Sequence, residues 1–452
     1  MVLKNMLKME NLFLLICLIF GLIFLFVNPL FQAPDEPTHL FKMWGYTNKS
    51  LYYIKKDGQS GHVVPDSFIQ LFNFYYKYRF DKSNKVSVFE TIYVSHLKLE
   101  KNHASFVNIV PSSYTPISYF PSFLILWLLK ILNVNPLWII YIMRFCSLMV
   151  YLALCYFAIK TTPVKKEFFC IFSLLPICVY QSASISTDGL CFGLIMLFFA
   201  YTFRLAFEKE KVGLKQILKF GVLITLITIC KFAYLPLIFL YFLIPSKKMP
   251  FNYLKTFLII LFINILEIVC FVLFNLSVVQ KASNAFSEIT MSPWLLLADM
   301  IRHPFVYLQG VLYTTKQFFM LYVVSVVICF GWDSTLLPGY SLVAWLVLIC
   351  TAVFSSDSKS NFFLSNKNKA IAAVCGVLTY FVVTTAVYLV YQRFPLIIGV
   401  QGRYLVPVAF LFLMIFFNKT FVLKNKIVLF LIFLLWMMVL GVSVLTLIER
   451  FY

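Results

Sequence analysis

The chain has 452 residues, of which 62% are hydrophobic and only 12% charged, and its mean hydropathy is +0.89. A soluble domain is about half apolar and a quarter charged, so this composition excludes a soluble fold and predicts an all-α polytopic membrane protein. The net charge of +20 does not indicate nucleic-acid binding. Much of the lysine lies in short connections between apolar runs, as it does on the cytoplasmic side of membrane proteins.

The first apolar run, from Asn11 to Val27, contains no charged residue and follows Lys4 and Lys8. No small-residue cleavage site comes after it, so we expect a retained signal-anchor helix. The next segment, from Gln32 to His39 (QAPDEPTH), brings two carboxylates and an imidazole together at the membrane boundary. Charged groups are costly to desolvate there, so their presence indicates a function.

Asp35 and Glu36 are adjacent, and His39 follows them by four and three residues, so a helix would place the imidazole on a shared face. One carboxylate could act as a general base or bind a cation while the imidazole donates a proton or orients its partner. Pro34 and Pro37 suit the first turn of a helix. The alternative interpretation is therefore an acidic residue that caps the helix N-terminus.

Lysine-rich connections predict the topology. Those at 160–166, 209–219, 246–255, 358–369 and 419–426 are expected to be cytoplasmic. Between them we expect about eleven spans. They lie near residues 11–28, 137–159, 167–184, 188–206, 214–230, 232–245, 254–276, 338–355, 370–391, 403–418 and 427–448.

Two further apolar segments would reverse this charge pattern if they crossed the membrane. They are Pro116–Leu132 and Trp294–Phe330, and we expect both to be interfacial. The chain is then a single membrane-embedded domain (1–452). A large extracytoplasmic loop (28–136) with juxtamembrane helices carries the acidic motif, and a second extracytoplasmic region covers 277–337.

Three candidates lie inside or beside the spans. Asp188 follows a run of small residues at a helix start, where it could bind substrate hydroxyls or simply cap the helix. Lys231 interrupts a long apolar stretch together with Tyr234, and an isolated membrane lysine is a candidate for binding phosphate. Its alternative role is an ion pair with Glu267 in the following span. Arg144 is a lesser candidate, near the outer end of its span, where we expect it to pair with a loop carboxylate.

The second strong motif runs from Gly399 to Pro407 and includes Gln401, Arg403 and Tyr404. Arg403 begins a span on the outer side, where a planar guanidinium suits bidentate phosphate recognition. Gly402, beside it, would allow another backbone to approach closely.

These motifs, taken in order, resemble a bacterial integral-membrane family of unknown function that is grouped with the GT-C superfamily of polyprenyl-phosphate-sugar-dependent glycosyltransferases. The motifs are Pro34 to His39, Tyr114-Thr115-Pro116, Arg144, Ser184 to Asp188, Lys231 to Pro236, Gly331-Trp332-Asp333 and Gln401 to Tyr404. The resemblance implies a GT-C-like bundle in which Asp35 or Glu36 is the base or the ligand of a divalent cation such as Mg or Mn. It also implies that Arg403, Lys231 and Arg144 bind the lipid phosphate, with Asp333 as a further substrate-binding candidate.

The sequence therefore predicts a glycosyltransferase of the bacterial inner membrane that transfers a sugar from a polyprenyl-phosphate donor to an extracytoplasmic glycan or glycolipid. Asp35, Glu36 and His39 are its candidate catalytic residues. Arg403, Gln401, Tyr404, Lys231, Tyr234, Asp188, Arg144 and Asp333 are its candidate substrate-binding residues. Two rival functions are a transporter or flippase, which would not need the carboxylate pair, and a polymerase of lipid-linked polysaccharide.

Overall fold

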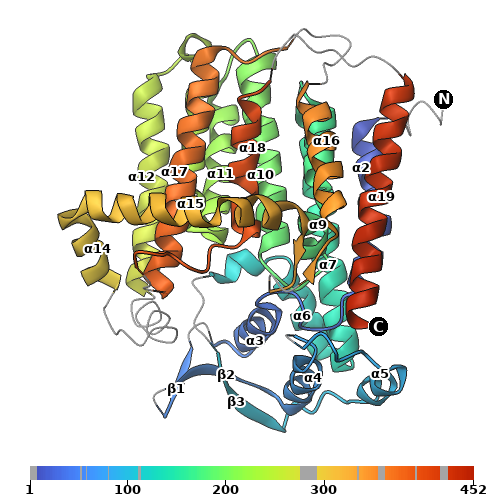
Figure 1. Ribbon diagram of the computed structural model, residues 1–452. Coiled ribbons are helices and arrows are strands. Elements are labelled where there is room, and N and C mark those ends of the chain that lie inside the picture. Colours follow the sequence, from blue (N-terminus) through green and yellow to red (C-terminus); the bar gives the residue numbers. More distant parts are fainter. Residues whose placement is uncertain are drawn as a thin grey trace.

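A computed structural model shows a bundle of helices with a small mixed region at one end (Figure 1). It describes residues 8–50, 53–57, 59–79, 81–109, 114–274, 293–332, 335–354, 362–391, 394–417 and 426–452. The predicted all-α polytopic membrane class is confirmed, since apolar helices make up most of the described chain.

The elements of the bundle follow the predicted order. They are α2 (Met9–Val27), α7 (Pro136–Thr161), α8 (Lys166–Ser173), α9 (Pro176–Ser182), α10 (Asp188–Phe203), η2 (Arg204–Glu208), α11 (Leu214–Cys230), η3 (Phe232–Leu243), η4 (Ser246–Lys248), α12 (Tyr253–Phe274), α14 (Pro293–Arg302), α15 (Pro304–Ile328), α16 (Gly339–Phe354), α17 (Asn366–Tyr391), α18 (Gly402–Met414) and α19 (Lys426–Phe451). Each of the eleven expected spans falls on one or two of these helices. The span expected at 167–184 is broken into α8 and α9, because Pro176 cannot continue the hydrogen-bonding pattern of α8.

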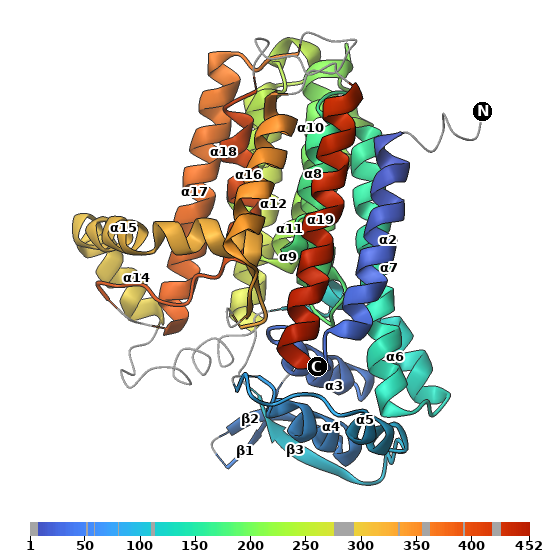
Figure 2. The ribbon, with the colours of Figure 1, turned by 45° about the vertical axis from the view of Figure 1, so that its right-hand side comes forward.

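Seven helices in the described part of the chain are long and apolar enough to cross a membrane: α2, α7, α10 with η2, α12, α15, α17 and α19. By this criterion α15 would be a span, although the loop charges predict an interfacial segment. In both ribbon views its axis runs across those of α12 and α17 instead of alongside them (Figure 1, Figure 2). Its orientation therefore agrees with the interfacial interpretation.

The large loop folds into a layer beneath the bundle. It contains α3 (Glu36–Thr47), β1 (Ile54–Lys56), β2 (Gln59–Pro65), α4 (Asp66–Tyr76), α5 (Val88–Ser95), β3 (Ala104–Asn108), η1 (Pro116–Tyr119) and α6 (Ser122–Ile131). The three strands form an antiparallel sheet in the order β1-β2-β3, with Ile54 opposite Gly61 and His62 opposite Val107. A second pair, β4 (Cys329–Phe330) and β5 (Thr335–Leu336), follows α15.

The helix α6 supports the interfacial interpretation of Pro116–Leu132. Its ten residues extend about 15 Å, only half the thickness of the hydrocarbon core. The sheet of the large loop was not predicted, because its strands are short and lack a clear apolar alternation. We call the end of the bundle that carries this layer the loop end; it is the lower end in Figure 1.

The break between α11 and η3 brings a polar residue to the loop end of the bundle. Pro236 interrupts regular helix geometry, and the chain turns back through the 3-10 helix η3. Packing fixes this turn, because η3 contacts α17 and α11, while α18 contacts α17 and α15. The turn at Lys231 and the start of α18 thus face each other across one end of the bundle.

Candidate active site

Four charged side chains form a continuous chain of ion pairs at the loop end of the bundle. The Arg403 guanidinium donates from Nη2 to Oδ2 of Asp35 at 2.7 Å and from Nη1 to Oδ2 of Asp188 at 3.0 Å. The other oxygen of Asp188 accepts from Nζ of Lys231. Residues from four distant parts of the sequence thus meet, and their formal charges sum to zero.

The start of α18 holds Arg403 in place. Gln401 accepts from Nε of Arg403 through Oε1 at 2.7 Å, and the Tyr404 hydroxyl lies 3.1 Å from Nη2. A Cβ atom on Gly402 would lie only 2.2 Å from the carbonyl carbon of Ser325 in α15. The predicted close backbone approach is therefore present, and it places the transverse helix directly against the arginine's own backbone.

The carboxylates of Asp35 and Asp188 make no capping hydrogen bonds at the starts of their helices. Asp35 precedes α3 with φ of 64° and makes no capping hydrogen bond, and Asp188, the first residue of α10, directs both oxygens to cations. The two differ in exposure, since 36% of the Asp35 side chain is accessible but only 3% of the Asp188 side chain. Of the two carboxylates in this chain of ion pairs, Asp35 is thus the one that a ligand can reach.

Glu36, next to Asp35, lies in a separate and fully enclosed ion pair with Arg144. Nε and Nη2 of Arg144 donate to the two oxygens of Glu36 at 2.8 and 2.7 Å, and both side chains are 0% exposed. The backbone N–H groups of Phe31 and Ile185 donate to the same carboxylate. Arg144 also donates to the carbonyl oxygens of Leu25, Asn28 and Pro29.

This second pair joins α7, the end of α2 and the start of α3. The pairing of Arg144 with a loop carboxylate was predicted, but neither Glu36 nor Arg144 reaches the chain of ion pairs at Arg403. With every donor and acceptor occupied inside the protein, the pair fixes the backbone that presents Asp35.

His39 lies on the buried side of α3. Its Nδ1 is 2.8 Å from the Tyr119 hydroxyl, and its ring lies 5.1 Å from the ring of Tyr114. Burial lowers the pKa of His39 to about 4, against the opposing influence of Asp35 and Asp188. The imidazole is therefore neutral at pH 7, where one ring nitrogen can accept a proton and the other can donate one.

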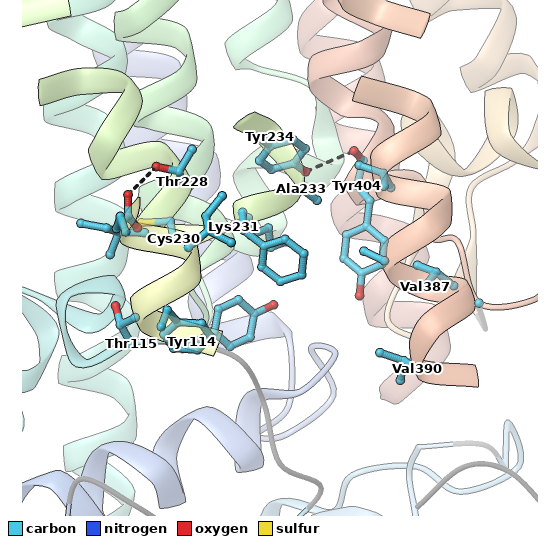
Figure 3. A pocket seen from close by; sticks show the side chains of 18 of the residues that line it. Tyr114, Thr115, Thr228, Cys230, Lys231, Ala233, Tyr234, Val387, Val390 and Tyr404 are labelled. Carbon is cyan, nitrogen blue, oxygen red and sulfur yellow. Dashed lines mark hydrogen bonds between the residues drawn. The ribbon is translucent and has the colours of Figure 1, made fainter. Parts of the chain in front are cut away.

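An apolar cavity of about 230 Å³ adjoins the ion pairs (Figure 3). Tyr114 and Lys231 lie on one side of it, and Val387 and Val390 of α17 lie on the other. The ammonium of Lys231 is 4.7 Å from the ring centroid of Tyr404, a cation–π contact. The cavity thus combines a hydrocarbon-like wall with a cation on one side.

Tyr234 has a structural contact at this site. Its hydroxyl donates to the backbone carbonyl of Tyr404 at 3.1 Å, which ties η3 to α18 (Figure 3). Lys231 does not pair with Glu267, the alternative partner, because Asp188 binds its ammonium. Asp333 lies outside the residues that the structure describes.

Sequence reasoning missed two residues near the site. Tyr391 lines the cavity, together with Glu267, and the guanidinium carbon of Arg79 lies 3.5 Å from the ring centroid of Trp332. Burial lowers the pKa of Arg79, while nearby Tyr76 and Asp35 raise it. An isolated arginine in the outer loop was the one available signal for Arg79.

The described residues do not fit a divalent cation at the acidic motif. Both oxygens of Glu36 are bound by Arg144, and the guanidinium of Arg403 occupies one oxygen of Asp35. Across the described segments, no group of three or more His, Cys, Asp or Glu side chains could hold a metal ion.

The fold and the charged site define an integral membrane protein with a polar center at one end of its bundle. Residues 18–412 match the model of the family described as "Predicted membrane protein (DUF2142)", and the chain belongs to that family. No match was found among curated proteins or among solved structures.

Proposed function

We propose that the chain is a GT-C-type membrane glycosyltransferase that transfers a sugar from a polyprenyl-phosphate donor to an extracytoplasmic glycan or glycolipid. The observation that carries the proposal is the meeting of Asp35, Arg403, Asp188 and Lys231 beside an apolar cavity. A carboxylate that a ligand can reach, two cations and a hydrocarbon-lined space are what transfer from a lipid phosphate requires.

In the proposed reaction Asp35 is the general base. Its Oδ2 faces Arg403, while its Oδ1 accepts no hydrogen bond from the described residues and can take the proton of an acceptor hydroxyl. The hydroxyl oxygen forms a bond to the anomeric carbon as the bond from that carbon to the phosphate oxygen breaks. The sugar leaves the lipid with inversion, and the lipid phosphate departs with the electron pair of the broken bond.

Arg403 and Lys231 stabilise the charge that grows on the leaving phosphate. Asp188 binds both cations, so it positions them and keeps their charges balanced before the lipid arrives. Gln401 and Tyr404 orient the guanidinium through the contacts described above. We assign Glu36 and Arg144 to positioning the loop and not to catalysis.

Membrane orientation follows from the lysines. The connections around 160–166, 209–219 and 246–255 join helices at the end of the bundle opposite the loop end (Figure 1). The positive-inside rule makes that end cytoplasmic, so the site would face outward from a bacterial inner membrane.

The test is sugar transfer in membranes supplied with native lipid donors. Asp35→Asn should abolish transfer, whereas Asp57→Asn should leave it unchanged. Asp57 is an ideal control because it is exposed and also has a left-handed backbone, with φ of 49°, which asparagine tolerates. Full transfer by folded Asp35→Asn protein would refute the assignment.

The same variants separate an enzyme from a carrier. A flippase would bind the lipid phosphate through Arg403 and Lys231 but would need no accessible carboxylate. An Asp35→Asn protein that still moves the lipid-linked sugar across the membrane, and functions as the wild type does, would favour the carrier. Arg403→Ala should weaken donor binding by about 10- to 100-fold in either case, as expected for the loss of charge-assisted hydrogen bonds.

A further inference from the structure

One polar cluster inside the bundle has no part in the proposed reaction. It consists of Thr228 near the end of α11 and of Asn264 and Glu267 in α12. Glu267 lies two turns before the end of α12, a helix whose outward side exposes Phe262, Leu266 and Leu273. It also lines the cavity that contains Lys231.

Four acceptor oxygens surround the Thr228 hydroxyl. They are the backbone carbonyls of Ile224 and Thr225, at 3.2 and 2.9 Å, Oδ1 of Asn264 at 2.8 Å and Oε2 of Glu267 at 2.9 Å. The two carbonyls already accept from N–H groups of α11, so the two side-chain oxygens compete for the single hydrogen of the threonine hydroxyl. A second hydrogen is needed if both of these contacts are hydrogen bonds.

The amide of Asn264 cannot supply it. Its Nδ2 donates to the carbonyl of Ile260 at 2.8 Å, which turns Oδ1 toward Thr228. Turning the amide over would set Oδ1 against that carbonyl, two acceptors in contact. The carboxyl of Glu267 is the remaining source.

No cation stabilises Glu267 as an anion within the described residues. Lys231 lines the same cavity but is bound to Asp188. A carboxylate without a counter-ion is costly at membrane depth, whereas a neutral acid can donate to Thr228. The number of hydrogens available around Thr228 and the lack of a counter-ion therefore both indicate that Glu267 is protonated.

We propose that Glu267 is a neutral carboxylic acid in the wall of the binding site for a phosphate-terminated isoprenoid. The inference rests on the proposed function for the identity of the lipid. The apolar side chains of α17 would contact the hydrocarbon chain, and Lys231 on the opposite side of the cavity would attract the phosphate. An ionised Glu267 would repel that phosphate; the neutral acid leaves Lys231 as the cation the lipid meets.

The experiment uses dicyclohexylcarbodiimide on the purified full-length protein. This apolar reagent adds the O–H of a carboxylic acid across one of its C=N bonds, and mass spectrometry locates the product. Glu267 should be labelled, and the ion-paired Glu36 and Asp188 should not. Undecaprenyl phosphate at ten times its dissociation constant should slow the labelling of Glu267 about tenfold, because about one site in eleven stays empty.

Variants test the hydrogen bond independently. Glu267→Gln remains neutral and can still donate to Thr228, so it should bind undecaprenyl phosphate as the wild type does. Glu267→Lys, with Asp188 intact, should change the affinity for undecaprenyl phosphate, because it places a positive charge in the wall of the cavity. Thr228→Val should alter the labelling rate, while Thr225→Val, on the same helix, should not.

Each outcome bears on one part of the proposal. Absence of labelling at Glu267 would overturn the neutral acid. Labelling that undecaprenyl phosphate does not slow would overturn the lipid site, even if Asp35→Asn still abolishes transfer. Protection by the lipid in a protein without any transferase activity would support the lipid site and refute the proposed function instead.

Discussion

Two adjacent carboxylates, Asp35 and Glu36, should give opposite phenotypes. Glu36→Gln removes the charge that faces Arg144 in a site that is 0% exposed on both sides. Breaking a buried ion pair by changing one partner costs about 3–5 kcal/mol, because the remaining charge is left uncompensated. Asp35→Asn, at a side chain that is 36% exposed, should cost less than about 1 kcal/mol.

The assay measures stability and transfer separately. Protein in detergent is heated in steps, and the fraction that remains monodisperse is measured by size-exclusion chromatography. We expect Glu36→Gln to lose stability and to retain transfer in proportion to the folded protein. Asp35→Asn should stay as stable as the Asp57→Asn control and lose transfer.

A double variant checks the physical reason. Glu36→Leu combined with Arg144→Met removes both charges and should be more stable than Glu36→Leu alone. The reasoning would be refuted by a Glu36→Gln protein that is as stable as the wild type but inactive. Such a result would make Glu36 the catalytic carboxylate and its ion pair part of the mechanism.

Three further predictions follow from the same geometry. Gly402→Ala should lower donor affinity about tenfold, since its Cβ would collide with the backbone of α15, while Gly441→Ala, with no atom within 4 Å of the new Cβ, should be neutral in the same binding assay. Asp188→Asn should destabilise the protein in the heating assay by leaving two cations together, and Lys231→Met should partly restore it. The pKa of His39 is about 4 in the folded protein and 6.5 in the unfolded chain, so its contribution to stability is complete above pH 6.5. The free energy of unfolding should fall by about 3 kcal/mol as the pH drops toward 4. His39→Gln should remove this loss from the pH profile of unfolding.

The sequence determined the class of this protein and the order of its helices. Hydropathy and the position of lysines are properties of short segments, because the free energy of transfer into lipid is roughly a sum over residues. The spans therefore fall where the apolar runs and lysine-rich connections predict them. The loop charges also predict that two further segments are interfacial, although length and composition alone make α15 a candidate span.

The motifs could be found from sequence because charges inside apolar surroundings stand out. Asp35, Asp188, Lys231 and Arg403 were each predicted as site residues, and the structure brings them together. The sequence could not distinguish Asp35 from its neighbour Glu36, and the ion-pair partner that it offered for Lys231 was Glu267, whereas the structure pairs Lys231 with Asp188.

Only the tertiary structure decided those pairings, because Asp35 and Arg403 are separated by 368 positions and meet through packing of distant helices. Whether a carboxylate is exposed or enclosed depends on which backbone amides and cations surround it, and these come from elements far apart in the chain. Local composition fixes which segments enter the membrane. The energy of each buried charge depends on neighbours that only the folded bundle supplies.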